Sequence, residues 1–257
     1  MSNFGPISLE ERRNIQLSML LELDKICRDN NIRYSLAYGT LLGAIRHKGY
    51  IPWDDDVDIM MPLEDISKLK KILPSSNMMY CDVDTIPTYE TTFPRLADCN
   101  TYRMSGKKYK TYGVCIDLYP FFRLKQTTEE QLQLFLKNSE KLRYWRHKFD
   151  SLRLKIFNRI PIKSFFPLQM YVKWMRDYVF TKGGEGKYYL LHGGPFLKRN
   201  VFDCNLFEEM MECDFEGHKF MCISKVHEYL TQEYGDYMTP PPESKRIPYH
   251  GANYYRK

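Results

Sequence analysis

The segment 39–59 combines a Gly39-Thr40 turn with the acidic run Asp54-Asp55-Asp56-Val57-Asp58. Small residues that open a helix present backbone N–H groups to an anion. Closely spaced carboxylates are ligands for a hard divalent metal ion. An anion site beside a metal ion is the minimum equipment for phosphoryl transfer. The segment therefore constrains the chain to a fold that brings a helix start and an acidic strand together.

The acidic run continues into a predicted buried strand over residues 56–61, which Pro62 ends. Side chains alternate along a strand, so Asp56 and Asp58 are expected on one face. They would be separated by roughly 6–7 Å, twice the rise per residue. Such a pair suits one or two Mg²⁺ (or Mn²⁺) ions. Asp54 and Asp55 precede the strand and are expected to have supporting roles.

The acidic run has three other possible interpretations: a calcium-binding loop, a solvated turn and a glycosyltransferase site. An EF-hand loop that starts at Asp54 requires Gly and Glu where the chain has Ile59 and Asp65. A solvated acidic turn is disfavoured by the apolar continuation from Ile59 to Met61. A glycosyltransferase also uses an Asp-x-Asp pair, but the upstream Gly-Thr turn is not part of that pattern.

The block resembles the signature of the LicD/fukutin-related family of phosphotransferases, which resemble nucleotidyltransferases in fold. That pattern has a Gly-Thr turn, an Asp-x-Asp strand and a third carboxylate on a later strand, here Asp117. Residues 112–120 resemble the second block of the family. The segment 234–246, with Tyr234-Gly235-Asp236 and three consecutive prolines, resembles the third. One departure is Met221-Cys222, where family members often have Pro.

The resemblance implies a fold class of α+β with an α/β-like core: a nucleotidyltransferase-like mixed sheet flanked by helices, with a helical insertion or second lobe. It also implies a donor such as CDP-choline and transfer of phosphocholine to a sugar hydroxyl, with release of CMP. The acceptor would be a lipopolysaccharide, teichoic acid or capsular polysaccharide precursor. CDP-ethanolamine, CDP-glycerol and CDP-ribitol remain alternative donors. Nucleotidyl transfer remains an alternative reaction, and a non-catalytic adaptor an alternative role.

The candidate site residues follow from this chemistry. Asp56, Asp58 and Asp117 are the candidate catalytic residues and metal ligands, and Asp117 is either a ligand or the proton acceptor. Substrate phosphates would be bound by backbone amides of the turn and by guanidinium groups, which bind phosphate bidentately. These candidate substrate-binding residues are Gly39, Thr40, Arg46, Arg95 and Arg246.

Composition excludes several other classes of protein. The 257 residues are 43% hydrophobic, which is sufficient for a sizeable core. No stretch approaches 18 apolar residues, and the first residues carry no secretory signal. Seven Cys without a Cys-x-x-Cys pair suggest reduced thiols, hence a cytoplasmic protein. The six His show no zinc-type spacing.

Residues 141–187 contain twelve Lys or Arg against three acidic residues, interleaved with aromatic side chains. Such a stretch suits peripheral contact with an anionic membrane at its inner face, where a lipid-linked acceptor is found. A solvated face on packed helices is the alternative. No nucleic-acid-binding module is recognisable, so no nucleic-acid partner is expected.

The expected organisation is one domain over residues 1–257. Its nucleotidyltransferase-like core covers about 8–125 and is completed by about 200–257, with a basic helical insertion at about 126–190. Ser8 should cap a helix that runs to about residue 29. Expected strands cover 32–38, 56–61, 79–83, 92–96 and 113–119; expected helices cover 41–46, 63–73, 129–148, 167–180 and 224–233, with a hairpin turn at 215–220.

Overall fold

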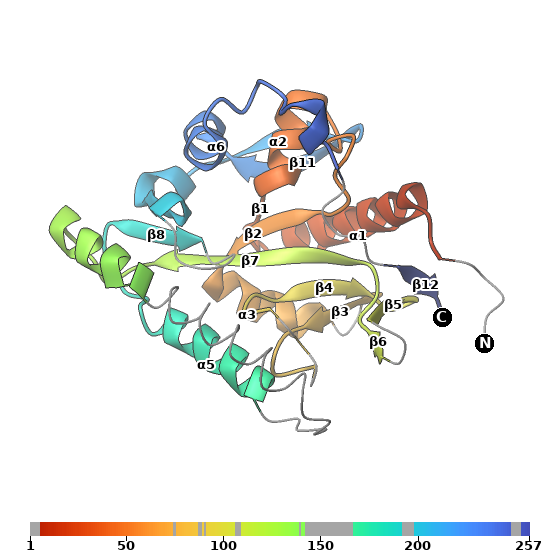
Figure 1. The fold of residues 1–257 in the computed structure, drawn as a ribbon, viewed down its shortest axis with the longest axis horizontal. Coiled ribbons are helices and arrows are strands. Elements are labelled where there is room, and N and C mark those ends of the chain that lie inside the picture. The colour runs from red at the N-terminus through yellow and green to blue at the C-terminus, as the bar shows by residue number, and fades with distance from the viewer. Residues whose placement is uncertain are drawn as a thin grey trace.

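The computed structural model describes residues 6–73, 76–86, 89, 91–105, 109–138, 140–141, 167–191, 198–247 and 253–257. It confirms the α+β class, because helices flank a mixed seven-stranded sheet (Figure 1). The expected division into core and insertion stays a prediction. Most of the basic stretch 141–187 and the end of the helix predicted to reach 148 lie outside the described residues.

The sheet is built around one parallel pair of strands, β2 and β7 (Figure 1). The antiparallel strands β1, β4 and β3 complete the order β1-β2-β7-β4-β3, and β8 and β9 extend it from β7. The bounds are β1 Ser35–Leu36, β2 Asp58–Pro62, β3 Met78–Cys81, β4 Arg95–Asp98, β7 Cys115–Arg123, β8 Tyr188–Leu191 and β9 Val201–Asp203. A parallel strand buried on both faces reads as a continuous apolar run, and every residue of β2 is buried.

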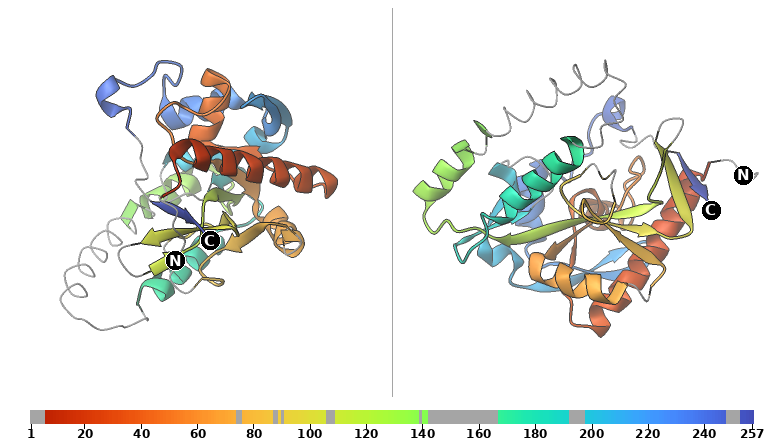
Figure 2. Two further views of the ribbon diagram at one scale, coloured as in Figure 1. Left: turned by 90° about the vertical axis from the view of Figure 1, so that its right-hand side faces the viewer. Right: turned by 90° about the horizontal axis from the view of Figure 1, so that it is seen from below.

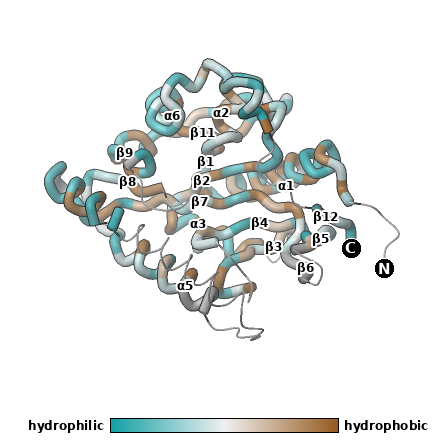
Figure 3. Tube along the Cα trace, viewed as in Figure 1, coloured by the Kyte–Doolittle hydropathy of each residue, from teal (hydrophilic) through white to brown (hydrophobic). Residues whose placement is uncertain are grey.

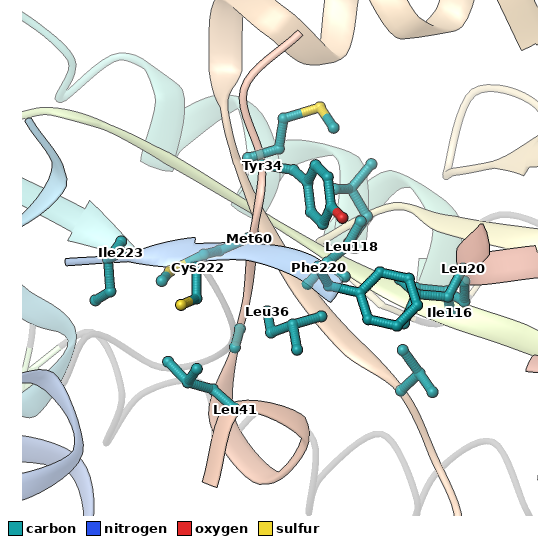
Figure 4. Packing of buried hydrophobic residues seen from close by; sticks show 14 of the residues in the cluster. Leu20, Tyr34, Leu36, Leu41, Met60, Ile116, Leu118, Phe220, Cys222 and Ile223 are labelled. Atoms are coloured by element: carbon teal, nitrogen blue, oxygen red, sulfur yellow. The ribbon is translucent and has the colours of Figure 1, made fainter. Parts of the chain in front are cut away.

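The main core lies on both sides of this pair. Leu20, on the apolar stripe of α1 (Leu9–Asp29), packs in one cluster with Ile116 and Leu118 of β7 and with Phe220 (Figure 4). Hydropathy follows the same layering, with apolar residues concentrated in the central strands (Figure 3). The Ser8 cap is confirmed, since its Oγ accepts a hydrogen bond of 3.1 Å from the Glu11 N–H.

Smaller elements surround this core (Figure 2). Helices α3 Leu63–Ile72 and α5 Pro167–Phe180 agree with prediction, as does the hairpin of β10 Met210–Phe215 and β11 His218–Ile223; residues 129–138 are helical. A separate sheet contains β12 Tyr254–Arg256, β5 Thr101–Ser105 and β6 Tyr109–Thr111. The 3₁₀ turns are η2 Lys198–Asn200, η3 Cys204–Phe207 and η4 Glu243–Lys245.

Two boundaries near the acidic segment differ from the prediction. Strand β2 begins at Asp58, so Asp56 lies in the preceding loop and the two carboxylates do not share a strand face. The predicted helix 41–46 is α2, Tyr38–His47, and it already includes Gly39 and Thr40 in its first turn. The reason is local: Ala37 is extended, and Tyr38 has a φ of 40°, so the chain turns one residue before the Gly-Thr pair.

Helix α6, Val226–Tyr234, carries an acidic side chain into the protein interior. It begins two residues later than predicted, after Lys225. The side chain of Glu233 is only 3% exposed, and its Oε2 lies 3.8 Å from Nε of Arg199. Among the described residues its Oε1 has no hydrogen-bond partner. Burial raises the pKa of Glu233 to about 7, against the weaker opposing effect of Arg199.

This buried acid makes stability depend on pH. Between its ordinary pKa of 4.5 and about 7, the folded state holds a proton that the unfolded state releases, so the free energy of unfolding falls as pH rises. Glu233→Gln should remove that loss and exceed wild type at pH 8 by up to about 3 kcal/mol, with a smaller difference at pH 5. Urea unfolding at both pH values measures the difference.

Glu228→Gln, on an exposed position of the same helix, is the matched control and should follow the wild-type curve. Parallel pH profiles for wild type and Glu233→Gln would contradict the assignment of a buried protonated acid.

Candidate active site

The parallel pairing of β2 and β7 brings two predicted carboxylates side by side. Asp58 is the register partner of Asp117, although 59 residues separate them in sequence. Paired residues on neighbouring strands point to the same face, and the two strands lie about 4.8 Å apart across the sheet. Both side chains are largely buried. The structure therefore places Asp58 and Asp117 together at the start of β2.

Arg95 of β4 is the other register neighbour of Asp117. Its Nε donates to Asp117 Oδ1 at 2.5 Å, and its second terminal nitrogen donates to Oδ2 at 3.2 Å. A third hydrogen bond joins the guanidinium to the Tyr112 hydroxyl. Both partners are about 10% exposed, so this is a buried bidentate ion pair. In the structure the Arg95 guanidinium is paired with Asp117, and its predicted role in binding phosphate stays a prediction.

The loop before β2 holds three further carboxylates. Single oxygens of Asp54, Asp55 and Asp56 all lie within 4.8 Å of one another. Burial and the charge of Asp56 raise the pKa of Asp54 to about 7. Asp55 is buried in an ion pair with Arg12 of α1. The sequence assigned only a supporting role to Asp54, but the structure places its carboxylate in the acidic cluster.

Asp58 is the most crowded member of this set. Burial raises its pKa well above the ordinary value, and the nearby charges of Asp56, Asp117 and Asp54 raise it further. Its Oδ1 is buried and has no hydrogen-bond partner in the described part of the chain. A buried polar atom without a partner is costly, and crowded carboxylates are a typical cation environment. These residues therefore fit a divalent metal ion.

The Gly39-Thr40 turn, which was predicted to bind an anion, makes contacts with the acidic residues of the protein. A Cβ on Gly39 would lie 2.5 Å from Oδ2 of Asp54, so only glycine allows this carboxylate to approach the start of α2. The Thr40 hydroxyl is buried and accepts a hydrogen bond of 2.8 Å from the Asp58 N–H. Thr40 thus fixes the start of β2 to the first turn of α2.

Two arginines gather beside the loop from distant parts of the chain. Arg46 donates to Nε2 of His47 at 2.9 Å and to the Tyr237 carbonyl at 2.6 Å. Arg246 lies 5.3 Å over the ring of Trp53 and donates to the Pro241 carbonyl. Burial lowers the pKa of Arg46, and the charge of Arg246 contributes.

No carboxylate of the described residues lies within ion-pair distance of either guanidinium. Arg46 and Arg246 both hydrogen-bond neutral acceptors instead. Two like charges held close together without an acidic partner favour a multiply charged anion.

Sequence reasoning missed the tyrosines of this site. Tyr38 and Tyr119 meet edge to face, with ring centroids 4.8 Å apart. Tyr234 is 43% exposed as a whole residue. Burial of its hydroxyl raises its pKa, and the charges of Asp58, Asp54 and Asp56 raise it further, so it lies close to the acidic cluster. Tyr234 could have been found from the sequence, because it stands at the start of the segment 234–246 that resembles the third family block. No spacing rule singles out Tyr38 or Tyr119.

Comparisons with known proteins identify relatives of this chain. The chain is 27% identical over 256 residues to the lipopolysaccharide cholinephosphotransferase LicD of Haemophilus influenzae, which covers 95% of this chain and 96% of that protein. An uncharacterised protein of Rickettsia typhi is 32% identical over 44% of this chain and 36% of its own length. Human ribitol 5-phosphate transferase FKRP is 49% identical over 41 residues, 16% of this chain and 8% of FKRP.

The family described as "LicD/FKTN/FKRP, nucleotidyltransferase domain" matches residues 31–163, which is more than half of the chain. The matched range begins just before β1 and includes both the acidic loop and Asp117. The predicted resemblance is therefore confirmed: this chain belongs to the LicD/FKTN/FKRP family.

Proposed function

We propose that this protein transfers phosphocholine from CDP-choline to a sugar hydroxyl of a cell-surface glycan or glycolipid precursor and releases CMP. The observation that carries this proposal is the juxtaposition of Asp58 and Asp117 in adjacent strands. Membership of a phosphotransferase family and the near full-length similarity to LicD support it. The name of that relative is the argument for choline and for lipopolysaccharide as the acceptor.

Asp58, Asp56 and Asp117 would hold Mg²⁺, with Asp54 beside them. When bound, the ion would neutralise charge on the donor's two phosphates. Oδ1 of Asp58, which has no hydrogen-bond partner among the residues that the structure describes, is the oxygen most in need of such a ligand. Asp117 is oriented by Arg95, which hydrogen-bonds both of its oxygens.

Arg46 and Arg246 would bind the phosphate oxygens that face away from the carboxylates. In the transfer step, the acceptor hydroxyl oxygen forms a bond to the phosphorus that carries choline. The bond from that phosphorus to the bridging oxygen breaks, and CMP leaves with the electron pair. A carboxylate of the site accepts the hydroxyl proton. In-line placement of acceptor and leaving group accounts for much of the rate in such reactions.

The donor and the reaction type can be tested together. Purified protein with Mg²⁺ and a lipopolysaccharide acceptor is incubated with CDP-choline, CDP-ethanolamine, CDP-glycerol, CDP-ribitol or CTP. We expect CMP release with CDP-choline to be fastest. Preference for CDP-ribitol would instead follow the local similarity to FKRP. Release of pyrophosphate from CTP, with CMP left on the acceptor, would indicate nucleotidyl transfer and overturn the proposal.

Asp58→Asn should reduce transfer on the order of 100-fold or more, because it removes a charged ligand without changing volume. The melting temperature should not fall, since the substitution removes one of several crowded like charges. Excess EDTA should abolish wild-type turnover. Asp214→Asn, whose partner is the surface residue Lys219, is the control and should retain activity. Full turnover by Asp58→Asn would exclude the metal mechanism.

We further propose that the protein contacts the inner membrane face peripherally. None of the helices in the described residues is both long and apolar enough to span a bilayer. Trp174 of α5, which follows Lys173 in the basic stretch 141–187, is 55% exposed, and its ring centroid lies 6.0 Å from that of Tyr178. An exposed aromatic residue among basic residues suits the headgroup region.

Trp174→Ala should weaken binding to vesicles that contain phosphatidylserine by several-fold, with little effect on binding to purely zwitterionic vesicles. Met238→Ala is the control, because Met238 is similarly exposed but lies elsewhere. Cosedimentation measures both. Equal binding by wild type and Trp174→Ala would show that this residue does not contact the membrane.

A further inference from the structure

Helix α1 presents an unusual row of buried polar side chains to the acidic loop, residues 51–56. Arg12 is 7% exposed and Gln16 is 2% exposed. Arg13 lies beside them at the rim. Buried polar groups are costly unless they are hydrogen-bonded, so their partners indicate what they hold in place.

Arg13 holds the backbone of the loop. Its terminal nitrogen donates to the carbonyls of Ile51 at 3.0 Å and Pro52 at 3.1 Å. Its Nε donates to the Asp54 carbonyl at 3.2 Å. The guanidinium also stacks 4.8 Å from the centroid of the Tyr50 ring, which fixes its plane. One side chain thus ties three carbonyl groups, those of residues 51, 52 and 54, on the approach to the carboxylates.

Arg12 and Gln16 continue the same contact. Arg12 forms the buried ion pair with Asp55. The side-chain nitrogen of Gln16 lies 3.4 Å from the Asp55 carbonyl and 3.3 Å from the Cys115 carbonyl. Cys115 precedes Asp117 by two residues in β7. Gln16 therefore links the acidic loop directly to the strand that carries the third candidate ligand.

We propose that Arg12, Arg13 and Gln16 are positioning residues, which fix the acidic loop at its distance from Asp58 and Asp117 and thereby set the affinity for a divalent cation. The inference rests on the proposed function for its link to transfer. None of the three side chains has to touch substrate in this role. They act through the loop backbone and through Asp55.

Electrostatics explains why the loop requires external support. Asp54, Asp55 and Asp56 repel one another, and burial strengthens that repulsion. A loop free to relax would move these groups apart into water. A cation would then have to gather them again, and the cost of ordering the loop would reduce its affinity. Preorganisation by α1 removes that cost before the cation arrives.

The test is titration of the purified full-length protein with Mn²⁺ alone, followed by calorimetry or by the electron spin resonance of free Mn²⁺. Arg13→Gln should weaken Mn²⁺ binding by about 10-fold or more, as is typical when a partner that orients metal ligands is lost. Arg13→Lys keeps the charge but cannot bridge three carbonyls, so it should give an intermediate loss. Steady-state transfer should recover substantially when Mn²⁺ is raised to saturation.

Arg28→Gln is the matched control. Arg28 lies on the same helix and also donates to carboxylates, those of Asp24 and Glu212, but it is about four helical turns from Arg13 and contacts β10. It should lower stability slightly and leave Mn²⁺ affinity unchanged. If Arg13→Gln does not fold, Gln16→Leu and Arg13→Lys provide the same comparison. Thermal melts of each variant separate a loss of stability from a loss of affinity.

The outcomes distinguish this inference from the proposed function. Unchanged Mn²⁺ affinity in folded Arg13 and Gln16 variants would overturn the positioning role, whatever their melting temperatures. Absence of Mn²⁺ binding by wild type would overturn both the positioning role and the metal mechanism. If wild type binds Mn²⁺, the variants bind it weakly and no CDP-alcohol is consumed, the positioning role stands and the proposed function fails.

Discussion

The parallel pairing of β2 with β7 is the constraint on which the rest of the structure depends. It forces Asp58 and Asp117 into neighbouring positions at a buried end of the sheet. Two carboxylates so placed are unfavourable unless charge or hydrogen bonds compensate them. Side chains from several surrounding helices and strands provide this compensation.

The compensation is uneven. Arg95 hydrogen-bonds both oxygens of Asp117, whereas Asp58 keeps one buried oxygen without a partner among the described residues. Arg12 neutralises Asp55, and the start of α2 lies against Asp54. Arginine side chains thus compensate the charges of Asp117 and Asp55. Asp58 is the position that this compensation leaves out: burial and the charges of Asp56 and Asp117 raise its pKa well above the ordinary value.

Much of this arrangement was predictable from the sequence, because it depends on local patterns. The acidic run, the Gly-Thr pair and the apolar residues after Asp58 indicated a helix start beside a buried strand. The segment around Asp117 showed strand alternation. The fold class and family followed, and both are confirmed.

Contacts between residues that lie far apart in the sequence could not be predicted. Arg95 was assigned to phosphate because an isolated arginine shows no sign of its partner, and register alone brings it to Asp117. Asp56 was placed on the strand because alternation continues through it, although β2 starts two residues later. The buried role of Arg12 was likewise hidden, since charged residues on a helix usually face water.

The third block of the chain has a consequence for biosynthesis. Tyr234 and Arg246 reach the acidic loop only after α6 and the proline-rich segment have been made. A nascent chain that ends before α6 already contains every candidate metal ligand but lacks Tyr234 and Arg246. The carboxylates proposed as metal ligands are therefore synthesised before Arg246, which is proposed to bind the donor's phosphates.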